Sequence, residues 1–233
     1  MGGQYQVENV VPLLPSLYLA PVSYYVRLVQ CGEVFVEQYE NYQKQTLRNR
    51  CRIASPNGVL PLTIPIVKPE TPKVLMRDTR ISDHGNWRHL HWQALTSSYR
   101  RTPFFEFYAD DFRPFYERKW EFLVDFNMAL QETVCRLMDI DVTVTRTASY
   151  YGDPQLSILN SLIGSAASLV EELSTFNSQL STFNSPLPTP PYYQLFSDRH
   201  GFMADLSIVD LLFNMGPESI LYLNQCNSCK KLP

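Results

Sequence analysis

Cations gather directly after the second β-rich run of the sequence, at Lys44, Arg48, Arg50 and Arg52. In an extended chain Arg48, Arg50 and Arg52 share one face, whereas in a helix Lys44, Arg48 and Arg52 do so. A guanidinium group donates paired hydrogen bonds to phosphate or carboxylate oxygens, which fits a nucleotide-linked sugar or an acidic group. The spacing therefore indicates an anion site. The alternative is a solvated basic face that pairs with nearby carboxylates.

Polar and aromatic residues around these cations are candidates for the rest of a binding site. Loops that follow the strands of a parallel sheet line the crevice in which ligands bind. We therefore expect Asn41 and Asn49 to orient a ligand by hydrogen bonds. Tyrosines that could stack on a sugar or base, or bond to it, are Tyr18, Tyr39, Tyr42 and Tyr99. The alternative for the aromatic-rich stretch at Tyr99 is packing in the core.

Histidines lie beside two tryptophans, and His91 is the candidate acid/base group. An imidazole with its ordinary pKa of about 6.5 suits proton transfer at neutral pH. His84, His89 and His91 lack the ligand spacing of a zinc site, and Cys226 and Cys229 lack a second pair. We therefore predict no metal site and no cofactor. The alternative for His91 is packing against the tryptophans.

Alternating strand and helix patterns predict the α/β fold class. Residues 7–14 and 33–38 are apolar and β-branched, and a helix that begins near Pro21 separates them. An Asn-Gly pair at residues 57–58 lies between apolar runs and predicts an antiparallel hairpin. Residues 141–147 read as a later strand. We predict a mixed sheet built from a βαβ-like N-terminal unit with an antiparallel hairpin insert, flanked by helices.

Other elements are expected from periodicity. Residues 74–81 read as a strand and residues 88–99 as a helix, followed by an aromatic-rich loop at residues 99–111. Apolar residues then recur at spacings of three and four from Pro114 to Leu137, which predicts one long amphipathic helix.

The composition divides the chain into an α/β core domain at residues 1–150, a segment at residues 151–191 and a C-terminal part at residues 192–233. We predict that the middle segment holds a helix and a mobile loop rich in Ser, Asn and Pro, because its duplicated heptapeptide offers little to bury. The last part is expected to be helical and to pack on the core. Its first helix would begin with a capping box at residues 207–210, and a second is expected at residues 218–225.

Composition also excludes several classes of function. The net charge of −3 gives no general attraction to phosphate backbones, so nucleic acid is not an expected partner. No apolar run approaches a membrane span, and no secretory signal pattern opens the chain. We therefore expect a cytoplasmic protein with free thiols. No P-loop, dinucleotide-binding glycine motif or Gly-x-Ser-x-Gly elbow occurs, and nothing defines an oligomer.

Motifs in a fixed order extend over nearly the whole chain. They comprise residues 40–53, the Asn-Gly turn with residues 62–66, then Trp87, His91, Tyr99 and residues 103–105, and finally residues 202–219. Their order and spacing resemble the WbqC-like family of bacterial surface-polysaccharide gene clusters. The tail at residues 206–214 is similar to the form found in Bacteroidetes members.

The resemblance implies a surface-polysaccharide setting, because members occur in O-antigen gene clusters and an amino-acid (glycine) transferase role has been suggested for some. The chain departs from the family pattern in two places. Many relatives end the first strand with His-Gln-Pro and follow the second with Asp-Asp, whereas residues 13–15 here are Leu-Leu-Pro and residues 37–38 are Glu-Gln. These substitutions remove a histidine and acidic groups that could be catalytic.

We predict a transferase, of aminoacyl or acyl type, that acts on a nucleotide- or lipid-linked sugar in surface-polysaccharide biosynthesis. Lys44, Arg48 and Arg50 would neutralise the anionic ligand, and His91 would act as acid/base. The alternative is a non-catalytic accessory protein that binds a saccharide or a partner of the same pathway. An enzyme requires His91 to share a concave pocket with these arginines.

Overall fold

The computed structural model describes residues 13–69, 71, 73–150 and 189–228. The sequence-based expectations for residues 7–12 and for nearly all of the segment at residues 151–191 lie outside the described residues.

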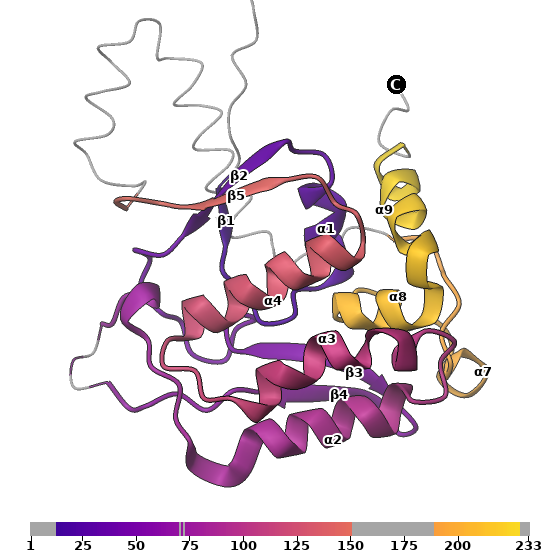
Figure 1. Cartoon of the computed structure of the whole chain (residues 1–233), viewed down its shortest axis with the longest axis horizontal. Helices are drawn as coiled ribbons and strands as arrows, with labels where there is room; N and C mark the ends of the chain where they lie inside the picture. The colour runs from indigo at the N-terminus through magenta and orange to yellow at the C-terminus, as the bar shows by residue number, and fades with distance from the viewer. Residues whose placement is uncertain (1–12, 70, 72, 151–188, 229–233) are drawn as a thin grey trace, which may run out of the picture.

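Three parallel strands form the sheet that opens the fold (Figure 1). Strand β1 (Leu13–Pro15) leads into helix α1 (Val22–Leu28), which returns the chain to β2 (Glu33–Glu37). Strand β5 (Thr143–Arg146) pairs with the other side of β2, which gives the order β1-β2-β5. The predicted mixed α/β fold with a βαβ N-terminal unit is confirmed.

The predicted hairpin is also present. Strand β3 (Arg50–Ser55) pairs antiparallel with β4 (Gly58–Thr63), so that Arg50 lies opposite Thr63. Gly58 has a φ of +100°, a backbone conformation that glycine adopts at low cost and that the tight turn requires.

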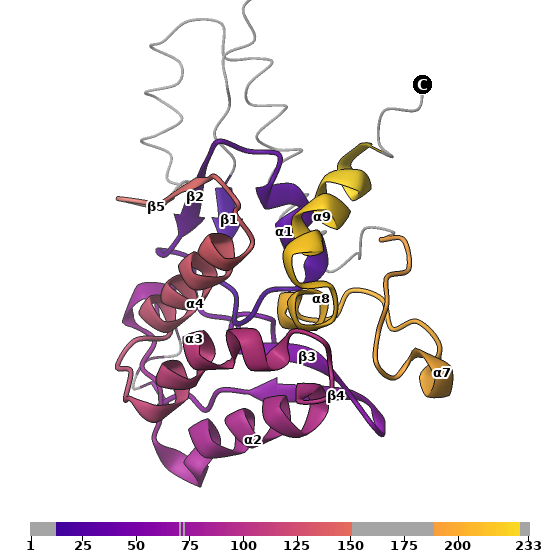
Figure 2. The ribbon, with the colours of Figure 1, turned by 45° about the vertical axis from the view of Figure 1, so that its right-hand side comes forward.

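Helices cover the sheet and the hairpin. Figures 1 and 2 show α4 (Leu123–Leu137) between the parallel sheet and α3 (Phe105–Glu117), with α2 (Trp87–Tyr99) farthest from the sheet. Helix α2 packs against both β3 and α3, and α3 packs against α4. Large side chains such as Tyr18 and Phe126 are fully buried at the centre of this arrangement.

The long helix expected from Pro114 to Leu137 is wrong, because the structure has two helices, α3 and α4. The backbone between these helices forms hydrogen bonds with residues 79–81. The Ile81 N–H donates to the Glu121 carbonyl (2.9 Å), and the Leu123 N–H donates to the Thr79 carbonyl (2.9 Å). These pairings replace helical hydrogen bonds. Most of the stretch expected to be an aromatic-rich loop after Tyr99 is α3 instead, because Phe105, Tyr108 and Phe112 recur at helical spacing and are buried.

The strand expected at residues 74–81 is also wrong. This segment contains the short 3-10 helix η1 (Met76–Asp78), and it pairs with its neighbours only through isolated bridges, such as Ile66 with Ile81 and Asn41 with Leu75. Each end of the segment contacts a different part of the chain, so no ladder forms. A second 3-10 helix, η2 (His84–Asn86), leads into α2.

The chain ends in α7 (Ser197–His200), α8 (Ile208–Met215), the 3-10 helix η4 (Gly216–Glu218) and α9 (Ser219–Ser228). Helices α8 and α9 pack against α1, and α8 also contacts α3 and β3.

The buried carboxyl of Asp210 links this C-terminal part to the core. It accepts hydrogen bonds from Tyr99 (2.9 Å), Tyr192 (2.7 Å) and Gln194 (2.8 Å). The capping box expected at residues 207–210 does not form, because Ser207 makes no side-chain cap bond and Asp210 faces these partners instead.

Within the described residues no helix has the length and apolar character needed to cross a membrane.

Candidate functional site

A groove of about 310 Å³ lies where the loop after β2 meets the end of the hairpin. Its lining comes from Tyr42, Lys44, Gln45, Asn49, Arg50 and residues 63–69. The volume is at the lower end of the range of small-molecule sites, about 300–1,000 Å³. We call it the β3–β4 groove.

The charge of the groove is positive. Lys44, Arg50 and Lys68 line it, and none of its described lining residues is acidic. The Nε of Arg50 is buried and has no hydrogen-bond partner among the described residues. No described residue forms an ion pair with this side chain. A buried guanidinium N–H without a partner is unfavourable. An anionic oxygen bound in the groove would accept a hydrogen bond from Arg50 and would neutralise part of the positive charge.

Asn49 forms part of the groove wall and fixes its shape. Its Nδ2 donates to the Ile64 carbonyl (2.9 Å), and the Asn49 carbonyl accepts from the Ile64 N–H (2.8 Å). The side-chain oxygen of Asn49 is buried without a partner among the described residues. It is therefore an acceptor that a ligand hydroxyl or amide could use.

Arg48 belongs to a different contact. Its guanidinium makes a two-point ion pair with Glu40, of which the Nε–Oε1 distance is 2.8 Å, and it does not line the groove. Arg52 donates to the Asp205 carbonyl (3.2 Å). The structure thus separates the three arginines, and Arg50 alone of them faces the groove.

Tyr42 lines the groove, but Tyr39 and Asn41 do not. Burial raises the pKa of Tyr42, while the charges of Arg50 and Arg48 act in the opposite direction. Tyr39 accepts a hydrogen bond from Arg77 (3.1 Å), whose guanidinium also lies over its ring. Asn41 is exposed.

His91 lies in the interior behind the groove and is not one of its lining residues. Its Nδ1 is 3.0 Å from the Tyr18 hydroxyl, which is 2.9 Å from the Tyr116 hydroxyl, and the ring also bonds to the Thr63 carbonyl. Burial lowers the pKa of His91 to about 4, so the ring is neutral at neutral pH. Thr63 lines the groove, so His91 supports its wall through the backbone.

Tyr18 and Tyr99 are fully buried and do not reach the groove. Tyr99 accepts a hydrogen bond from the Ala54 N–H (2.9 Å) and donates to Asp210. The structure therefore brings together Tyr42, Lys44, Asn49 and Arg50 of the candidate residues.

Sequence reasoning missed residues 63–69, and with them Lys68. The predicted hairpin could have indicated these residues. The turn at Gly58 sets Arg50 opposite Thr63, so the residues that follow Thr63 must pass beside the residues that precede Arg50.

Comparisons with known proteins agree with the resemblance read from the motifs. The sequence profile of the WbqC-like protein family matches residues 16–222, a range that includes every residue of the groove. The chain belongs to the WbqC-like protein family. An uncharacterised protein of Mycobacterium tuberculosis is 27% identical over 234 residues, which cover 93% of this chain and 98% of that protein. No solved structure matches.

In this WbqC-like protein, polar side chains join the ends of β1 and β2 to their neighbours. Glu37 is buried, and its Oε1 accepts hydrogen bonds from Thr147 (3.0 Å) and from the Tyr39 N–H (2.7 Å). Asn127 of α4 donates to the Ser16 hydroxyl (3.2 Å) and to the Arg48 carbonyl (2.9 Å). These polar contacts hold the ends of the parallel strands to α4 and to the loop that carries the groove.

Proposed function

We propose that the β3–β4 groove binds the phosphate or carboxylate of a nucleotide- or lipid-linked sugar, and that the protein is a cytoplasmic transferase of surface-polysaccharide biosynthesis. The anion-binding part of this proposal is supported by Arg50, whose Nε is buried without a hydrogen-bond partner among the described residues. The described lining of the groove also contains no acidic residue. The proposed pathway, its O-antigen setting and the relation to Bacteroidetes members rest on the family resemblance.

The groove residues have distinct roles in this proposal. Arg50 would bind two anionic oxygens at once because its donors are planar and paired, while Lys44 and Lys68 would add charge at the rim. The Asn49 side-chain oxygen would accept a hydrogen bond from a ligand hydroxyl. Catalysis by His91 stays a prediction, and its bond to Thr63 supports a positioning role.

A second candidate function is a non-catalytic accessory protein that binds the same sugar-linked anion. It is favoured by the chemistry of the groove, since none of its described lining residues is a histidine, cysteine or carboxylic acid. Such residues are the usual acid/base groups and nucleophiles of transferases.

A thermal-shift screen tests the anion site. Wild type, Arg50→Gln and the control Arg77→Gln would be heated with uridine diphosphate, UDP-N-acetylglucosamine, inorganic diphosphate and free amino acids. Arg77 is an exposed arginine that does not line the groove. A ligand at a hundred times its Kd stabilises the fold by about 2.7 kcal/mol, which raises Tm by several degrees.

We expect a shift with the phosphate compounds in wild type and Arg77→Gln and its loss in Arg50→Gln. Equal shifts in all three proteins would contradict the proposal. Mass spectrometry of the nucleotide sugar after incubation with activated acyl donors and saccharide acceptors then separates the two candidate functions: a transferase yields an acylated sugar or a released nucleotide, and an accessory protein leaves the compound unchanged.

A further inference from the structure

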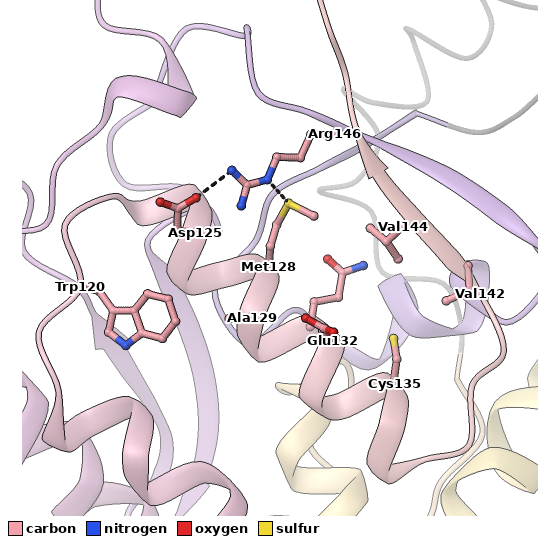
Figure 3. Close-up of a pocket in the computed structure, with 10 residues that line it drawn as sticks. Trp120, Asp125, Met128, Ala129, Glu132, Cys135, Val142, Val144 and Arg146 are labelled. Atoms are coloured by element: carbon pink, nitrogen blue, oxygen red, sulfur yellow. Dashed lines mark hydrogen bonds and ion pairs between the residues drawn. The ribbon is translucent and has the colours of Figure 1, made fainter.

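A second cavity, of about 680 Å³, lies over α4 beside β5 (Figure 3). In this view Trp120 lies on one side of α4, while Val142 and Val144 lie on the other side. It shares no lining residue with the β3–β4 groove, and its volume is within the range of small-molecule sites. We call it the α4–β5 cavity.

Two side chains that line this cavity carry hydrogen-bond donors without partners. Gln131 is only 6% exposed; its Oε1 accepts from the Tyr24 hydroxyl (3.3 Å), and its Nε2 has no partner among the described residues. The indole N–H of Trp120 is also buried without a described partner. Buried donors of this kind are rare in folded proteins because each has lost its bond to water. A ligand that supplies an acceptor oxygen beside Gln131 would satisfy its Nε2.

The Trp120 ring is held in place, so this donor is fixed. It lies parallel to Phe115, with an interplanar angle of 2° and centroids 5.8 Å apart. The Arg118 guanidinium lies over it, 4.0 Å from its centroid. The ring is therefore positioned in advance of any ligand, which lowers the entropic cost of binding.

The same cavity offers acceptors. Asp125 and Glu132 line it, and the Arg146 guanidinium bonds to Asp125 (2.7 Å). Two carboxylates against one guanidinium give the lining a net negative charge, opposite to that of the groove. A phosphate offers only anionic acceptors and would be repelled by the carboxylates. A ligand that fits all of these groups must both donate and accept, as a hydroxyl group does.

Apolar side chains complete the lining. Met128, Ala129, Val142 and Val144 present C–H surface between the polar groups. Hydroxyl groups around a carbon ring match this alternation, because the ring's C–H bonds pack on the apolar side chains while its hydroxyls reach the polar ones.

We propose that the α4–β5 cavity binds an uncharged saccharide. The saccharide itself is inferred from the donors, acceptors and apolar surface of this cavity alone.

The test uses nuclear magnetic resonance on the full chain labelled with ¹⁵N. Methyl N-acetyl-β-glucosaminide and methyl β-galactoside are titrated to concentrations on the order of 10 mM, which detects millimolar dissociation constants. We expect at least one of them to shift the side-chain resonances of Gln131 and Trp120. Gln131→Met keeps the length of the side chain and removes the donor, and it should weaken binding about tenfold. Gln93→Met, at an exposed position of α2, is the matched control and should bind as wild type does.

Shifts at the Asn49 side chain instead, or no shift in wild type with either glycoside, would overturn the inference whatever Gln131→Met does. Arg50→Gln keeps the two proposals distinguishable. We expect this variant to lose binding of uridine diphosphate and to retain the glycoside shifts.

Discussion

Arg48 and Glu40 form a two-point ion pair beside the β3–β4 groove, and this pair removes Arg48 from the set of cations available to a ligand. The side chains of Arg48 and Glu40 are only 14% and 17% exposed. The pair therefore stabilises the loop that carries Lys44 and Asn49, while Arg50 faces the groove. Neighbouring arginines that look equivalent in the sequence thus have different roles.

Arg48→Ala should destabilise the fold without removing the anion site. We expect the free energy of unfolding to fall by about 2 kcal/mol, since the Glu40 carboxylate loses a charged partner. The affinity for uridine diphosphate should change less than twofold. Urea denaturation and calorimetry measure the two effects. Arg113→Ala, which breaks an exposed pair with Glu117, is the control and should cost about 0.5 kcal/mol or less. A tenfold loss of affinity in Arg48→Ala would show that Arg48 binds the ligand itself.

His91 should make stability depend on pH. Its pKa falls from the ordinary value of about 6.5 to about 4 on folding, so between these values the unfolded state binds more protons. The neutral ring's contribution is fully present above about pH 6.5 and is lost as the pH falls toward 4. The loss amounts to about 3 kcal/mol. Urea denaturation at several pH values across this range measures how the free energy of unfolding changes with pH. This change should be smaller in His91→Gln than in wild type, and an equal change in both proteins would contradict the buried, neutral histidine.

Tyr99→Phe should affect stability but not binding. The substitution removes two hydrogen bonds, so the Ala54 N–H loses its acceptor and one oxygen of Asp210 loses a donor. We expect a loss of about 2–3 kcal/mol of unfolding free energy. Tyr39→Phe, which removes a hydroxyl from an exposed contact with Arg77, should cost less than about 1 kcal/mol. A direct role of Tyr99 in the site would instead appear as weaker binding of uridine diphosphate at unchanged stability.

Lys68→Gln should weaken the binding of anions several-fold, and more strongly at low salt, because Lys68 contributes charge to the groove without an acidic neighbour in its described lining. Lys73→Gln is the matched control, since Lys73 is exposed and lies outside the groove. Calorimetry with uridine diphosphate at two salt concentrations measures both. Equal affinities for the two variants would remove Lys68 from the site.

The sheet and the hairpin were predictable because local residues determine them. Short apolar runs before and after α1 define the βαβ unit, and Gly58 permits the turn that sets the register of β3 and β4. The division between α3 and α4 was not predictable. It depends on backbone hydrogen bonds to Thr79 and Ile81, which are distant in sequence.

The site was predictable only in part for the same reason. Arg50 and Lys44 stand out as cations in a polar loop after a strand, but the sequence does not show that Glu40 neutralises Arg48. It also does not show that the residues beyond Thr63 form the opposite wall. Tyr18, Tyr99 and His91 have the residue types of a binding site, yet their partners are other buried groups.

The most direct test of the anion site is the Nε–H resonance of Arg50, observed in ¹⁵N-labelled protein and assigned with Arg50→Gln. Arg48 provides the internal control, because its Nε already donates to Glu40. On addition of uridine diphosphate we predict a large shift of the Arg50 resonance and little change at Arg48. An Arg50 resonance that does not move while the nucleotide binds would place the anion elsewhere and contradict the account.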